Sequence, residues 1–472
     1  MSTFRIDNIA TVMGGSWLRR PHPDVELNGV GIDSREDMTR RAFIAIRGER
    51  HDGHDHVLAA VRAGALLIIV DRKPDETVLN HCAEAGVLLV EDCRKAMARL
   101  ALAHRRSLTA TKVIAVTGSA GKTTTKRLIH AALSKAMHGS CSPKSFNNEI
   151  GVPLTLLAAN PRDRYLVVEV GTNHPGEIAQ LARITEPDIA VITMIGRSHL
   201  AGLGSVADVA KEKAALLAYL RDDGCAIVNA DSPDLRPYLK PLENVILFGE
   251  SNDGNLRLTN RGRDGDSWWI EINERSRFRL GLPGKHNALN ALAAVAVGRR
   301  LGISDSHISE GLASVRPEAM RLAEEAIAGI TVFNDAYNAN PDSTIAAIET
   351  FAEWAAHAWR RLVILGDMLE LGHAAPDLHR EVGRHVLEVD RRCRIEHAVL
   401  VGPLSAFTAE AISRGWPMPR LTAAPELTEE SMARIASLMR PGDFVLVKGS
   451  RGVALERLVE YLKTRANASL TA

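Results

Sequence analysis

A glycine-rich turn followed by a lysine and three threonines is the part of the sequence best suited to chemistry. Residues 113–126 read VIAVTGSAGKTTTK. Adjacent backbone N–H groups at the start of a helix attract anions, and Gly118 and Gly121 allow the backbone to approach a phosphate closely. Lys122 can place its ammonium group on the outer phosphates, and Thr123 can offer its hydroxyl group to Mg²⁺. The turn therefore predicts a site for ATP or GTP.

One position departs from the usual phosphate-binding pattern, G-x-x-x-x-G-K-[ST]. That pattern requires a glycine where this chain has Val116, so the loop has the shorter form TGxxGKT. The alternative interpretation is a Gly-Lys-Thr sequence that merely begins a helix. The apolar run in front of the turn is typical of a buried strand, and it favours the nucleotide site.

Three downstream residues could bind cations beside the phosphates. Glu169 lies in the strand-like run 165–171, and His199 follows the run 188–196. Both therefore lie near the carboxyl ends of strands, where open α/β sheets bind ligands, and their side chains suit Mg²⁺ or Mn²⁺. Lys213 lies on the next predicted helix, where an ordinary ammonium group would repel a metal. Taken alone, the three could equally be a strand-end salt bridge, a surface histidine and a solvated lysine.

The elements that must position these residues form three blocks. Short apolar strands alternate with amphipathic helices, which predicts mostly parallel sheets with helices on both faces. Pro317 disfavours helix in the residue before it and is a plausible linker. We expect an α/β protein with three domains, at residues 1–108, 109–316 and 317–472.

Bulk composition narrows the function. The chain has 472 residues, with 58 Lys and Arg against 57 Asp and Glu, so no excess of positive charge indicates a nucleic-acid partner. The five cysteines are scattered and form no CxxC pair, which suggests a reducing compartment and no zinc site. The N-terminus lacks an apolar signal core, and the longest apolar runs are too short to span a bilayer. We expect a cytoplasmic protein without a membrane segment.

Seven motifs along the chain resemble the Mur ligase family and, within it, the ligases that add D-alanyl-D-alanine. They are TGSAGKTTTK (117–126), SFNNEIGVPLTLL (145–157), VEVGTNHPGEI (168–178), GKHNALNALAA (284–294), NDAYNANPDS (334–343), LGDMLELG (365–372) and VKGSRG (447–452). The resemblance covers nearly the whole chain, starting from GIDSR at 31–35. It implies a UDP-substrate-binding N-terminal domain, a central ATPase-like domain and a Rossmann-like C-terminal domain.

The resemblance also implies a reaction. ATP would phosphorylate the carboxylate of UDP-N-acetylmuramoyl-tripeptide, and the amine of D-alanyl-D-alanine would displace phosphate from the acyl phosphate. Two Mg²⁺ ions would be bound by Thr123, Glu169, His199 and Lys213. Lys213, fourteen residues after His199, matches the family lysine that becomes carbamylated, to N6-carboxylysine, and so turns into an anionic ligand. Lys211 is the other candidate on that helix. The enzyme would act as a monomer in peptidoglycan synthesis.

Further site residues follow from the same resemblance. The catalytic set would be Lys122, Glu169, His199, Lys213 and Arg321, with Arg321 reaching the ATP phosphates from the third domain. Substrate contacts would come from Ser34, Arg35, Asn147 and Asn148. ATP contacts would come from Gly118, Ser119, Ala120, Gly121, Lys122, Thr123, Thr124, Asn287, Asn290, Arg321, Asp335, Tyr337 and Asn338.

Simpler interpretations exist for several of these residues. Asn287 could be a helix cap, Arg35 could form a surface ion pair, and 334–343 could be a capped loop. For the HDGHDH segment at 51–56, a substrate-contacting loop is preferred over a metal site because the family has a similar stretch there. Lys448 matches a family motif and is given no individual step.

Competing functions remain open at this stage. The segment MIGRSHLAGLG departs from the family pattern, since Met194 replaces a polar residue and Ala201 an acidic one. One alternative is therefore an amide ligase with another amino acid or acceptor. The other is a non-catalytic scaffold that binds a nucleotide.

Overall fold

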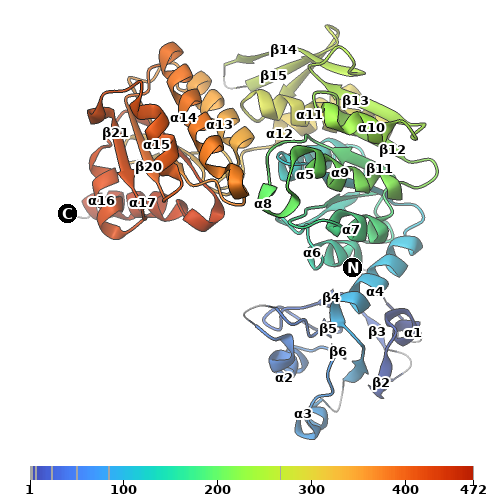
Figure 1. Cartoon of the computed structure of the whole chain (residues 1–472). Helices are drawn as coiled ribbons and strands as arrows, with labels where there is room; N and C mark the ends of the chain where they lie inside the picture. The colour runs from blue at the N-terminus through green and yellow to red at the C-terminus, as the bar shows by residue number, and fades with distance from the viewer. Residues whose placement is uncertain are drawn as a thin grey trace.

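The computed structural model has three α/β domains that follow one another along the chain (Figure 1). The structure describes residues 4–5, 8–22, 25–48, 51–82, 85–265 and 267–470. Every helix among these residues is too short or too polar to cross a lipid bilayer.

The N-terminal domain is built on a five-stranded sheet in the order β2-β7-β6-β5-β4. Its strands pair in parallel, apart from β2, which runs antiparallel to β7 at one edge. A two-stranded ribbon of β1 and β3 lies beside it. The elements are β1 (Phe4–Arg5), α1 (Ile9–Met13), β2 (Ser16–Arg19), β3 (Glu26–Leu27), β4 (Val30–Gly31), β5 (Ala42–Ile44), α2 (Val57–Arg62), β6 (Leu67–Val70), α3 (Glu76–His81), β7 (Gly86–Leu89) and α4 (Cys93–Ser107).

The central domain contains a nine-stranded sheet in the order β16-β15-β14-β13-β12-β11-β8-β10-β9. Its strands are β8 (Lys112–Thr117), β9 (Gly139–Cys141), β10 (Tyr165–Glu169), β11 (Ile189–Ile192), β12 (Cys225–Asn229), β13 (Val245–Gly249), β14 (Leu256–Asp264), β15 (Ser267–Ile272) and β16 (Ser276–Leu280). Its helices are α5 (Lys122–Leu133), α6 (Gly151–Ala158), α7 (Glu177–Thr185), α8 (Leu200–Leu203), α9 (Val206–Ala214), α10 (Arg236–Leu239), α11 (Lys285–Arg300) and α12 (Asp305–Ser314).

The register of this sheet brings the candidate site together. Strand β8 lies between β10 and β11, with Val116 opposite Glu169 and Thr117 opposite Ile192. All three strands are parallel, so the loops that leave their carboxyl ends meet at one edge. Strands β14 to β16 form an antiparallel extension at the far side of the sheet. Sequence analysis did not anticipate that extension.

The C-terminal domain has a six-stranded sheet in the order β17-β18-β22-β19-β20-β21. All pairs are parallel except β17 with β18. The elements are β17 (Ala323–Ile327), β18 (Ile330–Asp335), α13 (Pro341–Trp354), β19 (Arg360–Gly366), α14 (Ala375–Arg392), β20 (His397–Val401), α15 (Ser405–Ser413), β21 (Leu421–Ala424), α16 (Glu429–Ser437), β22 (Asp443–Lys448) and α17 (Glu456–Leu470).

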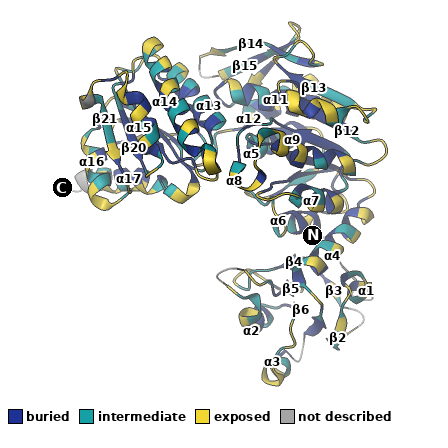
Figure 2. Cartoon of the chain, viewed as in Figure 1, coloured by how far each residue is buried: buried dark blue, intermediate teal, exposed yellow. Residues whose placement is uncertain are grey.

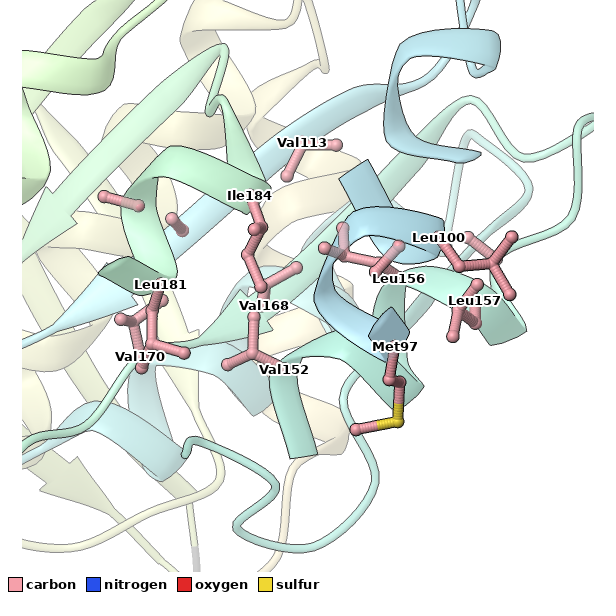
Figure 3. Close-up of a cluster of buried hydrophobic side chains, with 14 of the residues drawn as sticks. Met97, Leu100, Val113, Val152, Leu156, Leu157, Val168, Val170, Leu181 and Ile184 are labelled. Carbon is pink, nitrogen blue, oxygen red and sulfur yellow. The ribbon is translucent and has the colours of Figure 1, made fainter. Parts of the chain in front are cut away.

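The buried strands have helices packed on both faces, as Figure 2 shows by their dark colour beneath helices with exposed outer sides. In β8, Val113 and Ala115 face one apolar cluster, and Ile114 and Val116 face another, because successive strand side chains point to opposite faces. The first cluster extends from the strands of the N-terminal domain through α4 to α6 and α7 of the central domain. Figure 3 shows the part of it where Met97 and Leu100 of α4 lie near Leu156 and Leu157 of α6. The N-terminal and central domains therefore share one core.

Candidate active site

A cavity of about 930 Å³ lies where the carboxyl ends of β8, β10 and β11 face the C-terminal domain. It brings together residues from both domains that are more than 150 positions apart in sequence, such as Thr123 and Tyr337. Of the predicted site residues, Gly118, Lys213, Ser34 and Arg35 are not part of its wall. The predicted residues that line it are Ser119, Ala120, Gly121, Lys122, Thr123, Thr124, Asn147, Asn148, Glu169, His199, Asn287, Asn290, Arg321, Asp335, Tyr337 and Asn338.

The loop between β8 and α5 has the geometry of a phosphate cradle. Gly118 and Gly121 adopt φ values of 151° and 82°, which L side chains rarely adopt. A Cβ atom at Gly118 would overlap Thr193 Oγ1, and one at Gly121 would overlap Asn290 Oδ1. Lys122 Nζ donates to Gly118 O at 2.9 Å, so the lysine folds back over the loop. Both glycines are thus required by backbone conformation and by close packing.

Burial lowers the pKa of Lys122, and the nearby Arg321 guanidinium lowers it further, whereas the Glu169 carboxylate raises it. A polyanion in the cradle would favour the charged ammonium group. The electrostatics of the loop therefore suit a phosphate chain.

Glu169, at the end of β10, is almost fully buried and forms an ion pair with Lys126, whose Nζ lies 3.2 Å from Glu169 Oε2. Asn147 Nδ2 donates to the other carboxylate oxygen at 2.9 Å. Lys126 also donates to the Lys144 carbonyl. Sequence analysis missed Lys126; its place four residues after Lys122, on the same face of the helix, was the available indication.

His199 lies in a left-handed backbone conformation with φ of 55°, directly before α8. Its Nδ1 is 2.6 Å from Oε2 of Glu370, a residue of the C-terminal domain. That hydrogen bond lowers the pKa of the Glu370 carboxyl, although burial opposes the shift. A carboxylate on Nδ1 fixes the imidazole and leaves Nε2 as the second ring nitrogen, an arrangement common for metal-binding histidines.

Lys213 is completely buried near the end of α9, whereas Lys211 is exposed. Burial lowers the pKa of Lys213 well below its usual value, with a further contribution from Lys122 and an opposing one from Glu212. Its Nζ has no hydrogen-bond partner among the described residues. Glu212 instead accepts hydrogen bonds from the Gly176 and Ile178 backbone at the start of α7. The interpretation of Lys213 as a solvated surface lysine is therefore wrong.

The C-terminal domain contacts the phosphate loop through Arg321. Its Nη2 lies 3.2 Å from Thr123 Oγ1, and its guanidinium stacks 3.9 Å from the centre of the Tyr337 ring. The Tyr337 hydroxyl donates to Ser145 Oγ at 2.9 Å. An arginine from the third domain thus reaches the loop predicted to hold the triphosphate.

Polar contacts hold two further parts of the cavity wall, one around Asp335 and one around Asn287. Lys448 Nζ lies 2.6 Å from Asp335 Oδ2 and donates to the Asn338 carbonyl at 3.0 Å. Asn287 donates to the Pro283 carbonyl at 2.7 Å and accepts from Asn290 at 3.3 Å. The residue that caps α11 is Gly284 rather than Asn287, so Asn287 is not the helix cap.

The predicted UDP contacts lie elsewhere. Arg35 is exposed and forms two hydrogen bonds to Asp33 at 2.8 and 2.7 Å, which is the simpler surface-pair arrangement. The pairing holds the pKa of the Asp33 carboxyl at about 2. The role of Ser34 and Arg35 stays a prediction.

A possible metal cluster in the N-terminal domain is already saturated. Ligand atoms of His54, Asp71 and Cys93 lie within 4.8 Å of one another. However, His54 Nδ1 contacts Asp52 at 2.7 Å, and its Nε2 accepts from the Asp71 backbone at 3.3 Å. Burial also raises the pKa of the Cys93 thiol. Both ring nitrogens of His54 are therefore engaged in hydrogen bonds that join the loop at 51–56 to Asp71.

Comparisons with known proteins agree with this geometry. Three family models match, described as "Mur ligase family, catalytic domain" over residues 26–105, "Mur ligase middle domain" over 116–298 and "Mur ligase, glutamate ligase domain" over 320–451. The chain belongs to the Mur ligase family. The resemblance read from the motifs and the three-domain α/β fold are both confirmed.

Relatives of this Mur ligase match over almost its full length. Proteins named UDP-N-acetylmuramoyl-tripeptide–D-alanyl-D-alanine ligase are 35% identical in Bacillus subtilis, covering 97% of this chain and 98% of the relative, and 32% identical in Escherichia coli, covering 93% and 94%. A crystal structure of MurF from Acinetobacter baumannii has a TM-score of 0.86 at 29% identity, covering 98% and 99%. MurF from Thermotoga maritima in complex with ADP has a TM-score of 0.78 at 27% identity, covering 93% and 98%.

Proposed function

We propose that this Mur ligase joins D-alanyl-D-alanine to UDP-N-acetylmuramoyl-tripeptide at the expense of ATP. The observation that carries the proposal is one cavity in which a lysine-bearing phosphate loop faces an arginine from another domain. The relatives that bear this activity in their names match 97% and 93% of the chain.

In this reaction the protein has to position the reactants, and no side chain has to form a covalent bond with them. An oxygen of the tripeptide carboxylate attacks the γ-phosphorus of ATP, the bond from that phosphorus to the bridging oxygen breaks, and ADP leaves. The dipeptide amine then attacks the acyl carbon, and the carbon–oxygen bond to phosphate breaks. The products are an amide, phosphate and one proton.

Side chains in the cavity supply the charge compensation for the first step. Lys122 and Arg321 both contact the loop, and both would stabilise charge that builds up on the transferred phosphoryl group. Arg321 Nη2 contacts the Thr123 hydroxyl in this structure. The arginine would therefore have to move toward the phosphates when that hydroxyl binds a metal. Asn287, Asn290, Asp335, Tyr337 and Asn338 are the proposed nucleotide contacts.

The donor set fits two Mg²⁺ ions. Thr123 and Glu169 would hold one, and His199 and a carbamylated Lys213 would hold the other; the ions would neutralise phosphate charge when bound. The structural support is the Glu370 carboxylate on His199 Nδ1 and the buried, unpartnered Lys213 amine. A lowered pKa increases the uncharged share of the amine, and only an uncharged amine can react with CO₂.

A smaller cavity suits the acceptor dipeptide, which sequence analysis did not place. Its volume is about 300 Å³, and it adjoins Lys122 and His199 on one side and the C-terminal domain on the other. Arg451 in its wall offers a partner for the dipeptide carboxylate, and Glu370 offers one for the ammonium group. Asn147 and Asn148, in the large cavity, are the proposed contacts of the muramoyl-peptide.

A coupled assay of ADP release tests the proposal. Turnover should require both UDP-N-acetylmuramoyl-tripeptide and D-alanyl-D-alanine. Release of ADP with another amine but not with the dipeptide would instead support a different amide ligase. Binding of ATP without any single-turnover formation of acyl phosphate would support the scaffold interpretation.

A further inference from the structure

The loop that carries His199 is held by the C-terminal domain through Arg197. This loop runs from the end of β11 to the start of α8 in the central domain. The Arg197 backbone N–H donates to Asp342 Oδ2 at 2.7 Å, and its Nη2 donates to Asp342 Oδ1 at 2.7 Å. Its Nη1 donates to Glu381 Oε2 at 2.6 Å. One arginine thus joins two acidic residues of another domain.

These ion pairs are partly shielded from water. Arg197 and Asp342 are each 25% exposed, and Glu381 is 37% exposed. Asp342 lies in the first turn of α13, where a carboxylate is also favoured by the helix dipole, and Glu381 lies on α14. A planar guanidinium group can bind both carboxylates at once, which a lysine cannot reproduce.

The same loop has further contacts with the C-terminal domain. His199 contacts the Glu370 side chain, and the Ala201 backbone N–H donates to the Glu370 carbonyl at 2.9 Å. Leu200 packs against the apolar core of the C-terminal domain. The loop therefore belongs to the central domain in sequence but is fixed from the other side of the cavity.

The other side of the loop is joined to the phosphate cradle. The Gly196 backbone N–H donates to Ser119 Oγ at 2.9 Å, and Ser119 Oγ lies 3.1 Å from the Gly196 carbonyl. The Ser119 backbone N–H donates to the Met194 carbonyl at 2.9 Å. Asp342 is thus joined to the phosphate loop by its hydrogen bonds to Arg197, by the peptide bond from Gly196 to Arg197 and by the hydrogen bonds between Gly196 and Ser119.

We propose that Arg197 is a positioning residue that couples docking of the C-terminal domain to the arrangement of the His199 loop and the phosphate loop. With the domain docked, Asp342 and Glu381 hold Arg197 in place, and the loop presents His199 to the cavity. When the domain is undocked, the loop loses these contacts, and His199 is no longer held in the position that catalysis needs. This inference rests on the ligase function proposed above. It adds Arg197 as the residue that links domain closure to the arrangement of the active site.

The chain offers a matched control in Arg261. Arg261, on β14, binds Glu353 of α13 through Nη1 at 3.0 Å and Nη2 at 2.6 Å. This pair also joins the central and C-terminal domains with a two-point contact. It lies on the antiparallel extension of the sheet, and neither partner lines the two cavities. Loss of Arg261 therefore removes one ion pair between the domains but leaves every contact of the His199 loop in place.

The first test compares Arg197→Gln with Arg261→Gln in the full chain. Arg197→Gln should lower kcat by about tenfold to a hundredfold, because a small misplacement of reacting groups has effects of that size. KM for ATP should change by less than about threefold, since the nucleotide still binds the loop. Arg261→Gln should keep kcat within about threefold of the parent. Equal loss of kcat in both variants, or none in Arg197→Gln, would overturn the proposal.

A second measurement does not depend on ligase activity. Hydrogen–deuterium exchange, with a non-hydrolysable ATP analogue bound, should speed up at residues 118–121 and 194–203 in Arg197→Gln but not in Arg261→Gln. Asp342→Asn should reproduce the effect, and adding it to Arg197→Gln should change little further, because the two residues form one contact. Unchanged exchange at both segments would refute the coupling. The unmodified chain could prove inactive with the dipeptide while the variants still show this difference in exchange. That result would refute the proposed substrate and leave the coupling intact.

Discussion

Replacing Lys126 with methionine should destabilise the central domain far more than replacing an exposed lysine. Lys126 and Glu169 are 2% and 1% exposed, and their charged atoms lie 3.2 Å apart. Removing one partner of a buried ion pair leaves the other charge uncompensated, at a cost of about 3–5 kcal/mol. For a domain of this size, about 2–4 °C of melting temperature is lost per kcal/mol, so Tm should fall by about 6–20 °C.

The assay is scanning calorimetry of the full chain, with Lys112→Met as the matched control. Lys112 is the first residue of β8, the strand that leads into the phosphate loop. It is 56% exposed and pairs with Asp188 at 3.3 Å, so the loss of this ion pair should cost less than about 1 kcal/mol. The double variant Lys126→Met with Glu169→Gln should recover most of the lost Tm, because no charge is then left buried, yet it should stay inactive. If Lys126→Met melts at the same temperature as Lys112→Met, the buried pair does not stabilise the fold and the reasoning is wrong.

Four further predictions follow from the site. Lys122→Ala should abolish turnover and leave the circular dichroism spectrum unchanged; a collapsed spectrum would mean that the lysine is structural. Gly118→Ala should lose ADP binding in isothermal titration, since its φ of 151° is strained for alanine and its Cβ would overlap Thr193; affinity equal to that of the parent would contradict the cradle geometry. Lys213→Ala should regain activity with added short carboxylates, and failure of rescue while ATP still binds would count against the carbamate. Burial lowers the pKa of His286 to about 4, so the unfolded chain binds a proton that the folded chain does not between pH 6.5 and about 4, and stability should fall on acidification through that window by up to about 3 kcal/mol; a His286→Gln variant should show a smaller fall in Tm, and an equal fall would refute this assignment.

Sequence patterns predicted the residues that a parallel sheet brings together. The loop after β8, Glu169 at the end of β10 and His199 after β11 come from three adjacent parallel strands, so their meeting at one edge follows from the sheet alone. The motifs also predicted the family. The antiparallel extension was missed even though 256–280 carries the alternation of polar and apolar residues that is typical of exposed strands.

Contacts across the domain boundary could not be predicted in the same way. Glu370 on His199 and Asp342 on Arg197 depend on how two separate folds dock, and no local periodicity encodes that arrangement. Lys126 was missed for a different reason. A lysine on an otherwise amphipathic helix is usually solvated, and only its proximity to Glu169 shows that it is buried.

The two joints between domains should respond to added salt in opposite ways. The N-terminal and central domains share the apolar core that runs through α4, and strongly hydrated salts reinforce such contacts. The contacts between the central and C-terminal domains include the ion pairs of Arg197 and Arg261, which are weakened by screening. Concentrated sulfate should therefore strengthen the apolar joint between the N-terminal and central domains while it weakens the ion pairs that hold the C-terminal domain.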